Sequence, residues 1–242
     1  MKKILISIVS HDQRALVQNF INSFEKNILA NSLDITICIT NNLMDDVWKH
    51  DCKKFNIKTI QNVRPKGFGD NHNSAFSYFE SDYFFIVNPD IEIVFSLDLD
   101  YITSQIPRNG IASPNIISNT GKKEDFMRNE LSPINLLKRL IGFEKEPSED
   151  SFDWFAGMFI ITTSNYFYEI SGFDTRYFMY VEDCDLCRTV KENSGVLKIL
   201  SNIDVVHLAQ RDSRRSLPHL LLHLKSILKY WIKSKKNFNS ND

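Results

Sequence analysis

Short apolar runs rich in β-branched residues alternate with amphipathic segments along the first hundred residues. The runs predict buried strands at residues 4–10, 35–40, 57–61 and 83–87. Between them, apolar residues recur every three or four positions over 13–28 and 71–79, which predicts helices capped by Asp12 and Asp70. Because strands that alternate with helices are joined by right-handed crossovers, we expect an α/β fold with one mainly parallel sheet and helices on both faces.

The second half of the chain has a less regular pattern. Strands are predicted at residues 91–95, 110–114, 154–162, 196–200 and 205–208. Helices are predicted at residues 133–141 and 181–193, and the tail from Ser216 predicts an amphipathic helix with a leucine-rich face. No linker divides the chain, so we expect one domain over 1–215, followed by a C-terminal basic helix and tail over 216–242.

Composition and charge exclude several classes of protein. The 242 residues are 43% hydrophobic, enough for a sizeable core, and carry 29 basic against 30 acidic side chains. A dedicated nucleic-acid-binding protein would have a strong basic excess. No apolar run is long enough for a transmembrane helix, and the four cysteines do not predict a disulfide framework. A cytoplasmic location is therefore expected. Cys184 and Cys187 do not predict a zinc site, because the chain lacks the second cysteine pair that such a site requires.

Polar side chains are expected where the predicted strands end, because ligands bind beyond the carboxyl ends of a doubly wound sheet. Ser10 and His11, Asn41 and Asn42, and Asn88 and Asp90 occupy such positions. The neighbouring loop at residues 62–73 has two glycines and a lysine before a helix start, which suits a phosphate group. A glycine-rich turn without a ligand explains the same pattern equally well.

Two acidic motifs have both a chemical and a structural interpretation. Asp90 in Asn88-Pro89-Asp90 stands at a strand tip, where a carboxylate can bind Mg²⁺ or Mn²⁺, although an Asx turn has the same sequence. Glu182, Asp183 and Asp185 open a predicted helix among aromatic residues. Crowding and partial burial there can raise a carboxyl pKa into the range of a general base, but acidic residues also simply favour a helix N-terminus.

The last 32 residues carry a local basic excess. From Arg211 to Asp242 there are eight basic and two acidic residues. With the apolar face of the same helix, this composition suits an anionic membrane surface, or a docked helix with a solvated basic face. His207, at the end of the last predicted strand, is either a structural histidine or part of a metal site.

In this order along the chain, the motifs resemble those of inverting family 2 glycosyltransferases with a GT-A fold, particularly the branch of bacterial rhamnosyltransferases of O-antigen and capsule assembly. The matching segments are Ile8-Val9-Ser10-His11, Thr40-Asn41-Asn42, residues 65–73, Val87-Asn88-Pro89-Asp90-Ile91, Gly172-Phe173-Asp174, Tyr177-Phe178-Met179-Tyr180, Glu182-Asp183-Cys184-Asp185-Leu186-Cys187 and His207. The chain departs from the family in having Asn88 at the first position of the Asp-x-Asp metal motif, and Asn41 where Asp is frequent.

The resemblance implies transfer of a sugar from a nucleoside diphosphate donor to a glycan hydroxyl, with Mg²⁺ or Mn²⁺ as cofactor. It makes Asp183 the general base, supported by Glu182 and Asp185, and Asp90 and His207 the metal site. It implies acceptor contacts from Trp154 and Gly157, and diphosphate contacts from Arg211, Arg214 and Arg215. The implied donor nucleotide site consists of Ser10, His11, Asn41, Asn42, Lys66, Gly67, Phe68, Asn71, Asn73 and Asn88.

The resemblance further implies a nucleotide-binding half at 1–95 and an acceptor-binding half at 96–215. It favours dTDP-rhamnose as donor, with UDP-hexoses and UDP-N-acetylhexosamines as alternatives, and a lipid-linked acceptor at the inner membrane face. A catalytically silent nucleotide-sugar binding module is a further alternative. A sugar-phosphate nucleotidyltransferase is disfavoured because Ser10-His11-Asp12 lacks the glycine-rich signature of that class.

Overall fold

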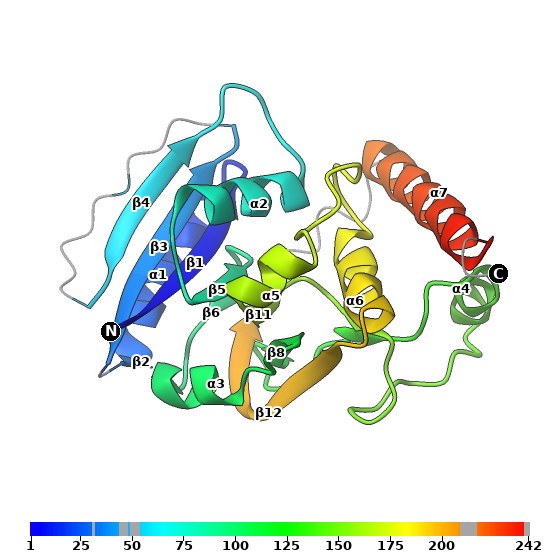
Figure 1. The fold of residues 1–242 in the computed structure, drawn as a ribbon. Coiled ribbons are helices and arrows are strands. Elements are labelled where there is room, and N and C mark those ends of the chain that lie inside the picture. The colour runs from blue at the N-terminus through cyan, green and yellow to red at the C-terminus, as the bar shows by residue number, and fades with distance from the viewer. Residues whose placement is uncertain (31, 44–47, 49–53, 209–216, 240–242) are drawn as a thin grey trace.

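A mixed eight-stranded sheet forms the centre of the computed structural model, which describes residues 1–30, 32–43, 48, 54–208 and 217–239 (Figure 1). In spatial order, the strands are β4 (Asn56–Gln61), β3 (Leu33–Asn41), β1 (Lys2–Ser10), β5 (Tyr83–Val87), β11 (Phe159–Thr163), β8 (Gly110–Ser118), β12 (Val196–His207) and β6 (Ile91–Glu92). Strands β4, β3, β1 and β5 run parallel, as do β8 and β12, whereas β11 and β6 are antiparallel to their neighbours. The predicted α/β class and mainly parallel sheet are confirmed.

Seven helices flank the sheet in the described residues. They are α1 (Arg14–Asn27), α2 (Phe68–Tyr78), α3 (Leu99–Gln105), α4 (Pro133–Leu140), α5 (Ser164–Glu169), α6 (Glu182–Glu192) and α7 (Leu217–Asn239). The crossovers from β1 to β3 and from β4 to β5 run in opposite directions along the sheet, so right-handed connections place α1 and α2 on opposite faces (Figure 1). Two small ribbons complete the fold: β2 (Ile28–Leu29) with β7 (Leu97–Asp98), and β9 (Met127–Arg128) with β10 (Trp154–Phe155).

Strand register brings the predicted binding segments to one edge of the sheet. Ser10 at the end of β1 pairs with Asn41 at the end of β3, and Ile8 pairs with Val87 at the end of β5. Each strand is apolar because it is buried on both faces, and all five residues of β5 are buried. The carboxyl ends of three neighbouring strands therefore lie side by side.

Both predicted helix caps are wrong. Helix α1 begins at Arg14 after Gln13, Asp12 has a φ of 60°, and the backbone N–H of Gln13 donates to Ser10 Oγ instead. Helix α2 begins at Phe68, so Asp70 lies inside its first turn. Gly67 is the N-cap residue, and a Cβ added there would come within 2.6 Å of the Phe178 carbonyl oxygen, which accepts from the Phe68 N–H at 2.9 Å.

Several predicted boundaries also change. The strand predicted at 154–162 is split into β10 and β11 around Gly157, and the two strands predicted between 196 and 208 form one bulged strand, β12. The strand predicted at 91–95 is only two residues long, as β6. The C-terminal helix is confirmed as α7. Among the described residues, no helix has the length and apolarity needed to cross a lipid bilayer.

Candidate active site

A pocket opens beyond the carboxyl ends of β1, β3 and β5. Its lining includes seven of the residues predicted to bind donor or metal, namely His11, Asn42, Lys66, Phe68, Asn71, Asn88 and Asp90. In the first turn of α2 the Phe68 N–H donates to the Phe178 carbonyl at 2.9 Å, the next backbone N–H groups have no intrahelical partner, and Lys66 precedes that turn. A positive helix end beside a lysine favours an anionic ligand in this pocket.

Asn42 connects the end of β3 to the loop that precedes α2. Its Oδ1 accepts hydrogen bonds from the Lys66 backbone N–H and the Asn62 side chain, both at 2.8 Å, and its Nδ2 donates to the Lys66 carbonyl at 3.0 Å. Asn71 in turn accepts a bond from Asn62 at 2.7 Å. This amide network fixes the loop against the sheet, so part of the predicted donor site positions the loop.

Four other predicted donor residues are held by neighbouring protein atoms. Asn41 is buried and accepts a bond from the Trp48 indole, and Ser10 accepts one from the Gln13 backbone. Asn73 binds the backbone N–H and C=O of Phe173 at 3.0 and 2.8 Å, while Gly67 packs against the 177–178 backbone. These residues shape the pocket from behind its lining.

Asp90 and His207 meet although they are 117 residues apart. The Asp90 Oδ2 to His207 Nε2 distance is 3.0 Å, and the Leu208 backbone N–H donates to the Asp90 carbonyl at 2.8 Å. Burial lowers the pKa of His207, but the hydrogen bond and charge of Asp90 outweigh it, so the pKa is raised overall. The pair comes from the turn after β5 and the end of β12.

The donor atoms of this pair fit a divalent cation that shares its coordination with a ligand. Asp90 Oδ1 and His207 Nδ1 are buried and make no hydrogen bond among the described residues. Within that part of the chain, no three His, Cys, Asp or Glu side chains gather into a metal site. A cation held here therefore needs further ligands, and phosphate oxygens are the kind that Mg²⁺ and Mn²⁺ favour.

Asp183 lies in the first turn of α6, held by two backbone groups. Its Oδ2 accepts from the Gly157 N–H at 2.9 Å, and its Oδ1 from the Cys184 N–H at 2.8 Å. The chain enters α6 through two consecutive left-handed residues, Tyr180 (φ 71°) and Val181 (φ 73°). This conformation is costly for a β-branched residue, and backbone strain of this kind concentrates at functional sites.

Glu182 and Asp183 share a low-dielectric environment. Burial is the main cause that raises the pKa of both, and the charge of Asp183 raises that of Glu182 further. Backbone hydrogen bonds favour the charged form of both groups, but Glu182 Oε2 is buried without a hydrogen-bond partner among the described residues, whereas both oxygens of Asp183 accept backbone N–H bonds. The charge of Asp183 raises the pKa of Glu182, which favours Asp183 as the ionised member of the pair.

The segment at Gly157 and Met158 links Asp183 to the turn that contains Asn88 and Asp90. Gly157 binds Asp183, and the Met158 carbonyl accepts from the Asn88 N–H at 2.9 Å. A Cβ added at Gly157 would lie 3.2 Å from Asp183 Cβ and 3.7 Å from the Phe68 ring, which lines the pocket. Asp183 therefore lies beside the pocket that contains Asp90.

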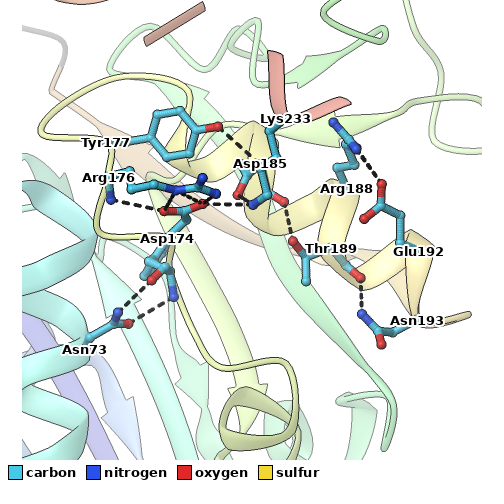
Figure 2. Close-up of polar contacts among 11 residues, drawn as sticks. Asn73, Asp174, Arg176, Tyr177, Asp185, Arg188, Thr189, Glu192, Asn193 and Lys233 are labelled. Carbon is cyan, nitrogen blue, oxygen red and sulfur yellow. Dashed lines mark hydrogen bonds and ion pairs between the residues drawn. The ribbon is translucent and has the colours of Figure 1, made fainter. Parts of the chain in front are cut away.

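Asp185 is engaged with helix α7. Its Oδ2 accepts from Lys233 Nζ at 2.6 Å, and its Oδ1 accepts from the Tyr177 hydroxyl at 3.3 Å (Figure 2). Lys233 also donates to Asp174 at 2.9 Å, and the Arg176 guanidinium beside Asp174 holds the pKa of that carboxyl well below its usual range. This ion-pair network fastens α7 to the loop that leads into α6.

Apolar packing supports the same attachment. A small core of Tyr177, Val181 and Cys184 contacts Ile227 and Tyr230 of α7. The Trp231 indole donates to the Leu131 carbonyl at 2.6 Å. The predicted C-terminal helix is thus a docked helix that packs on the first turn of α6.

The remaining predicted residues have structural contacts or lie outside the described chain. The Trp154 indole donates to the Asn129 carbonyl at 2.8 Å, and Gly157 holds Asp183. Arg211, Arg214 and Arg215 are outside the described residues. The sequence interpretation missed Lys233 and two histidines beside Tyr180, His219 and His223, which gave no signal beyond their place on a basic amphipathic helix.

Comparisons with known proteins agree with this architecture. No family model matches the chain. The rhamnosyltransferase WbbL of Escherichia coli (strain K12) is 26% identical over 98% of this chain and 96% of its own length. An N-acetylglucosaminyl-diphospho-decaprenol L-rhamnosyltransferase of Mycobacterium tuberculosis (strain CDC 1551 / Oshkosh) is 34% identical, over 34% of this chain and 27% of its own.

Solved structures show the same fold. GalNAc-T7 with UDP, GalNAc and Mn²⁺ has a TM-score of 0.62 at 14% identity, covering 88% of this chain and 44% of that one. The mannosyltransferase PcManGT of Pyrobaculum calidifontis, in complex with GDP-Man and Mn²⁺, has a TM-score of 0.61 at 10% identity, covering 96% and 64%. The resemblance to GT-A glycosyltransferases, and to rhamnosyltransferases among them, is confirmed.

Proposed function

We propose that this chain is an inverting glycosyltransferase that moves a sugar from a nucleoside diphosphate donor to a hydroxyl of a growing surface glycan. The observation that carries the proposal is the short link from Asp183 through Gly157 and Met158 to Asn88. It puts a backbone-held carboxylate beside a pocket suited to a diphosphate. Rhamnose from dTDP-rhamnose is the favoured donor because both curated relatives described above are named rhamnosyltransferases.

The proposed mechanism assigns each group a separate task. The nucleotide occupies the pocket between His11, Lys66 and Asn88, and its diphosphate lies toward Asp90 and His207. Asp183 removes the proton of the acceptor hydroxyl while that oxygen bonds to the anomeric carbon. The bond from this carbon to the diphosphate oxygen breaks on the opposite face, so one displacement inverts the anomeric centre.

Charge on the departing diphosphate has to be balanced. A bound Mg²⁺ or Mn²⁺ supplies Lewis-acid stabilisation of that charge. Asp90 and His207 would hold the ion, and Arg211, Arg214 and Arg215 are proposed to neutralise the diphosphate further. The two proposed halves, 1–95 for the nucleotide and 96–215 for the acceptor, would meet at the hydrogen bond from the Asn88 N–H to the Met158 carbonyl.

The acceptor is proposed to be a lipid-linked oligosaccharide, used on the cytoplasmic side of the membrane. Its hydroxyl would approach Asp183 past Trp154 and Gly157, the positions assigned to acceptor binding. Because a Cβ added at Gly157 would lie 3.2 Å from the Asp183 Cβ, tighter than ordinary contact, substitution there would press on the base as well as on the acceptor.

A donor panel tests the proposal. The purified chain is mixed with dTDP-rhamnose, UDP-hexoses or UDP-N-acetylhexosamines, with and without Mn²⁺, and the Tm and nucleotide release are measured. We expect dTDP-rhamnose with Mn²⁺ to raise the Tm, because a ligand that binds only the native state stabilises it, and to release dTDP. If nucleotide is released only from a UDP-sugar, the donor assignment changes to that sugar. If donors bind but no nucleotide is released from any of them, the chain is a silent binding module.

A further inference from the structure

Helix α7 exposes a stripe of apolar side chains on the face opposite its docked side. Leu220, Leu224, Leu228 and Ile232 follow one another at intervals of four residues, and each is 47–59% exposed. The docked side buries Ile227 and Tyr230 against the loop before α6. Attachment to the protein therefore leaves half of this amphipathic helix without an apolar partner among the described residues.

Helix α4 presents a second apolar stripe. None of its residues is buried, and Ile134, Leu137 and Leu140 are 59–76% exposed. Two further exposed residues, Ile141 and Phe143, follow it. Ten of the 21 large hydrophobic side chains exposed in the described part of the chain belong to these two helices and the residues directly after α4, so the exposure is concentrated there.

The two helices belong to the same end of the molecule. Leu131 and Leu136 pack against the small core that holds α7, and the Trp231 indole binds the Leu131 carbonyl. In Figure 1 the C-terminal part of α7 lies next to α4, far from β4 at the other end of the sheet. The two apolar stripes therefore lie on neighbouring helices at the same end of the molecule.

The charge of these helices identifies the partner that this surface fits. Of the 29 basic and 30 acidic residues of the chain, α4 and α7 contain seven basic and none of the acidic ones. Lys138 and Lys225 form no ion pair with any described residue, whereas Lys229 donates to the Arg176 carbonyl. Apolar side chains among unpaired lysines suit the headgroup region of an anionic bilayer, whereas a second copy would oppose like charges.

We propose that α4 and α7 together form the surface by which the protein lies on an anionic lipid bilayer. This inference deepens the proposed function, because a lipid-linked acceptor would then reach the active site from the same side. Helix α7 is suited to this role, since it packs directly against Tyr177, Val181 and Cys184, next to the base Asp183.

Vesicle sedimentation of the full chain tests the proposal. We expect the protein to bind phosphatidylglycerol–phosphatidylethanolamine vesicles about 10-fold more tightly than phosphatidylcholine vesicles, and less tightly in 0.5 M NaCl than in 0.1 M NaCl. The double variants Leu137→Gln/Leu140→Gln and Leu224→Gln/Leu228→Gln should each weaken binding by about 10-fold, because they remove buried apolar area in the bilayer. Tyr168→Gln is the control, since Tyr168 is 79% exposed but lies on α5.

The outcomes separate this proposal from the proposed function. Nucleotide release with a water-soluble acceptor, and the Tm with donor, should be unchanged in both double variants. Equal vesicle binding by these variants and the wild-type chain would overturn the bilayer surface and leave the enzymatic proposal intact. A wild-type dimer in light scattering that becomes a monomer in the double variants, without vesicle binding, would make the surface an interface between copies and also overturn it.

Discussion

The donor side and the base side of the candidate active site are built in different ways. On the donor side, three adjacent parallel strands end together, and neutral amides such as Asn42 and Asn62 join the loop to them. On the base side, Asp183 depends on two backbone contacts, of which only that from Gly157 comes from another segment, on a strained entry at Val181 and on the attachment of α7. Sheet register thus secures the first region, whereas a few long-range contacts secure the second, so single substitutions should affect the base side more.

The largest effect is expected from Asp183→Asn. An amide is isosteric with the carboxylate but cannot accept the acceptor proton, so kcat should fall by about 10³-fold. The donor site does not include this side chain, so donor affinity, measured as the ligand-dependent rise in Tm, should be unchanged. Loss of donor affinity together with rate would place Asp183 in the donor region and remove the distinction between the two sides.

Removal of the cation should have the next largest effect, on the donor side. EDTA should reduce nucleotide release by about 100-fold, and Mn²⁺ or Mg²⁺ should restore it. Asp90→Asn keeps the size of the side chain but removes its charge, so it should raise the Mn²⁺ concentration needed for half-maximal rate. Full activity in EDTA, or an unchanged Mn²⁺ requirement in the variant, would contradict the metal role of Asp90.

The donor side could be predicted from the sequence to a large extent. Apolar runs located β1, β3 and β5, and parallel pairing then required Ser10, Asn41 and Asn88 to lie at one edge. These features depend on local periodicity and on a general rule of sheet topology. What the pattern did not predict is that Asn41 and Asn42 bind protein atoms, because their partners come from other segments.

The base side could be predicted only in part. The acidic motif indicated a general base among Glu182, Asp183 and Asp185, and the family resemblance selected Asp183, but Gly157, which holds it, is 26 residues away, and Lys233 is 48 residues from Asp185. No periodicity encodes such tertiary contacts, and the choice between a membrane-bound and a docked C-terminal helix was open for the same reason. The structure shows that one face of α7 is docked and the other exposed.

A smaller effect is expected from Lys233→Ala. The substitution leaves Asp174 and Asp185 close together without their shared cation, so unfolding free energy should fall by about 2 kcal/mol. Because α7 would then support the α6 entry less firmly, kcat should fall by about 10-fold at unchanged donor KM, measured well below the Tm. Lys233→Arg keeps the charge and should restore most of kcat, whereas equal changes in kcat and KM would argue against a positioning role confined to the base side.

The smallest effect on rate is expected from Glu182→Gln, which tests whether Glu182 or Asp183 carries the proton of this buried pair. Burial raises the pKa of Glu182, so its neutral form is favoured in the folded state, and stability is lost as pH rises above the ordinary value near 4.5 toward the raised one. Glutamine mimics the protonated form, so kcat at neutral pH should change less than about twofold. Between pH 5 and 9 the free energy of unfolding should then decline less steeply in the variant than in the wild type. The two slopes should differ by up to about 1.4 kcal/mol per pH unit. Urea unfolding across this range measures the slope, and an equally steep decline in the variant would show that the proton resides on Asp183, which could not then act as the base.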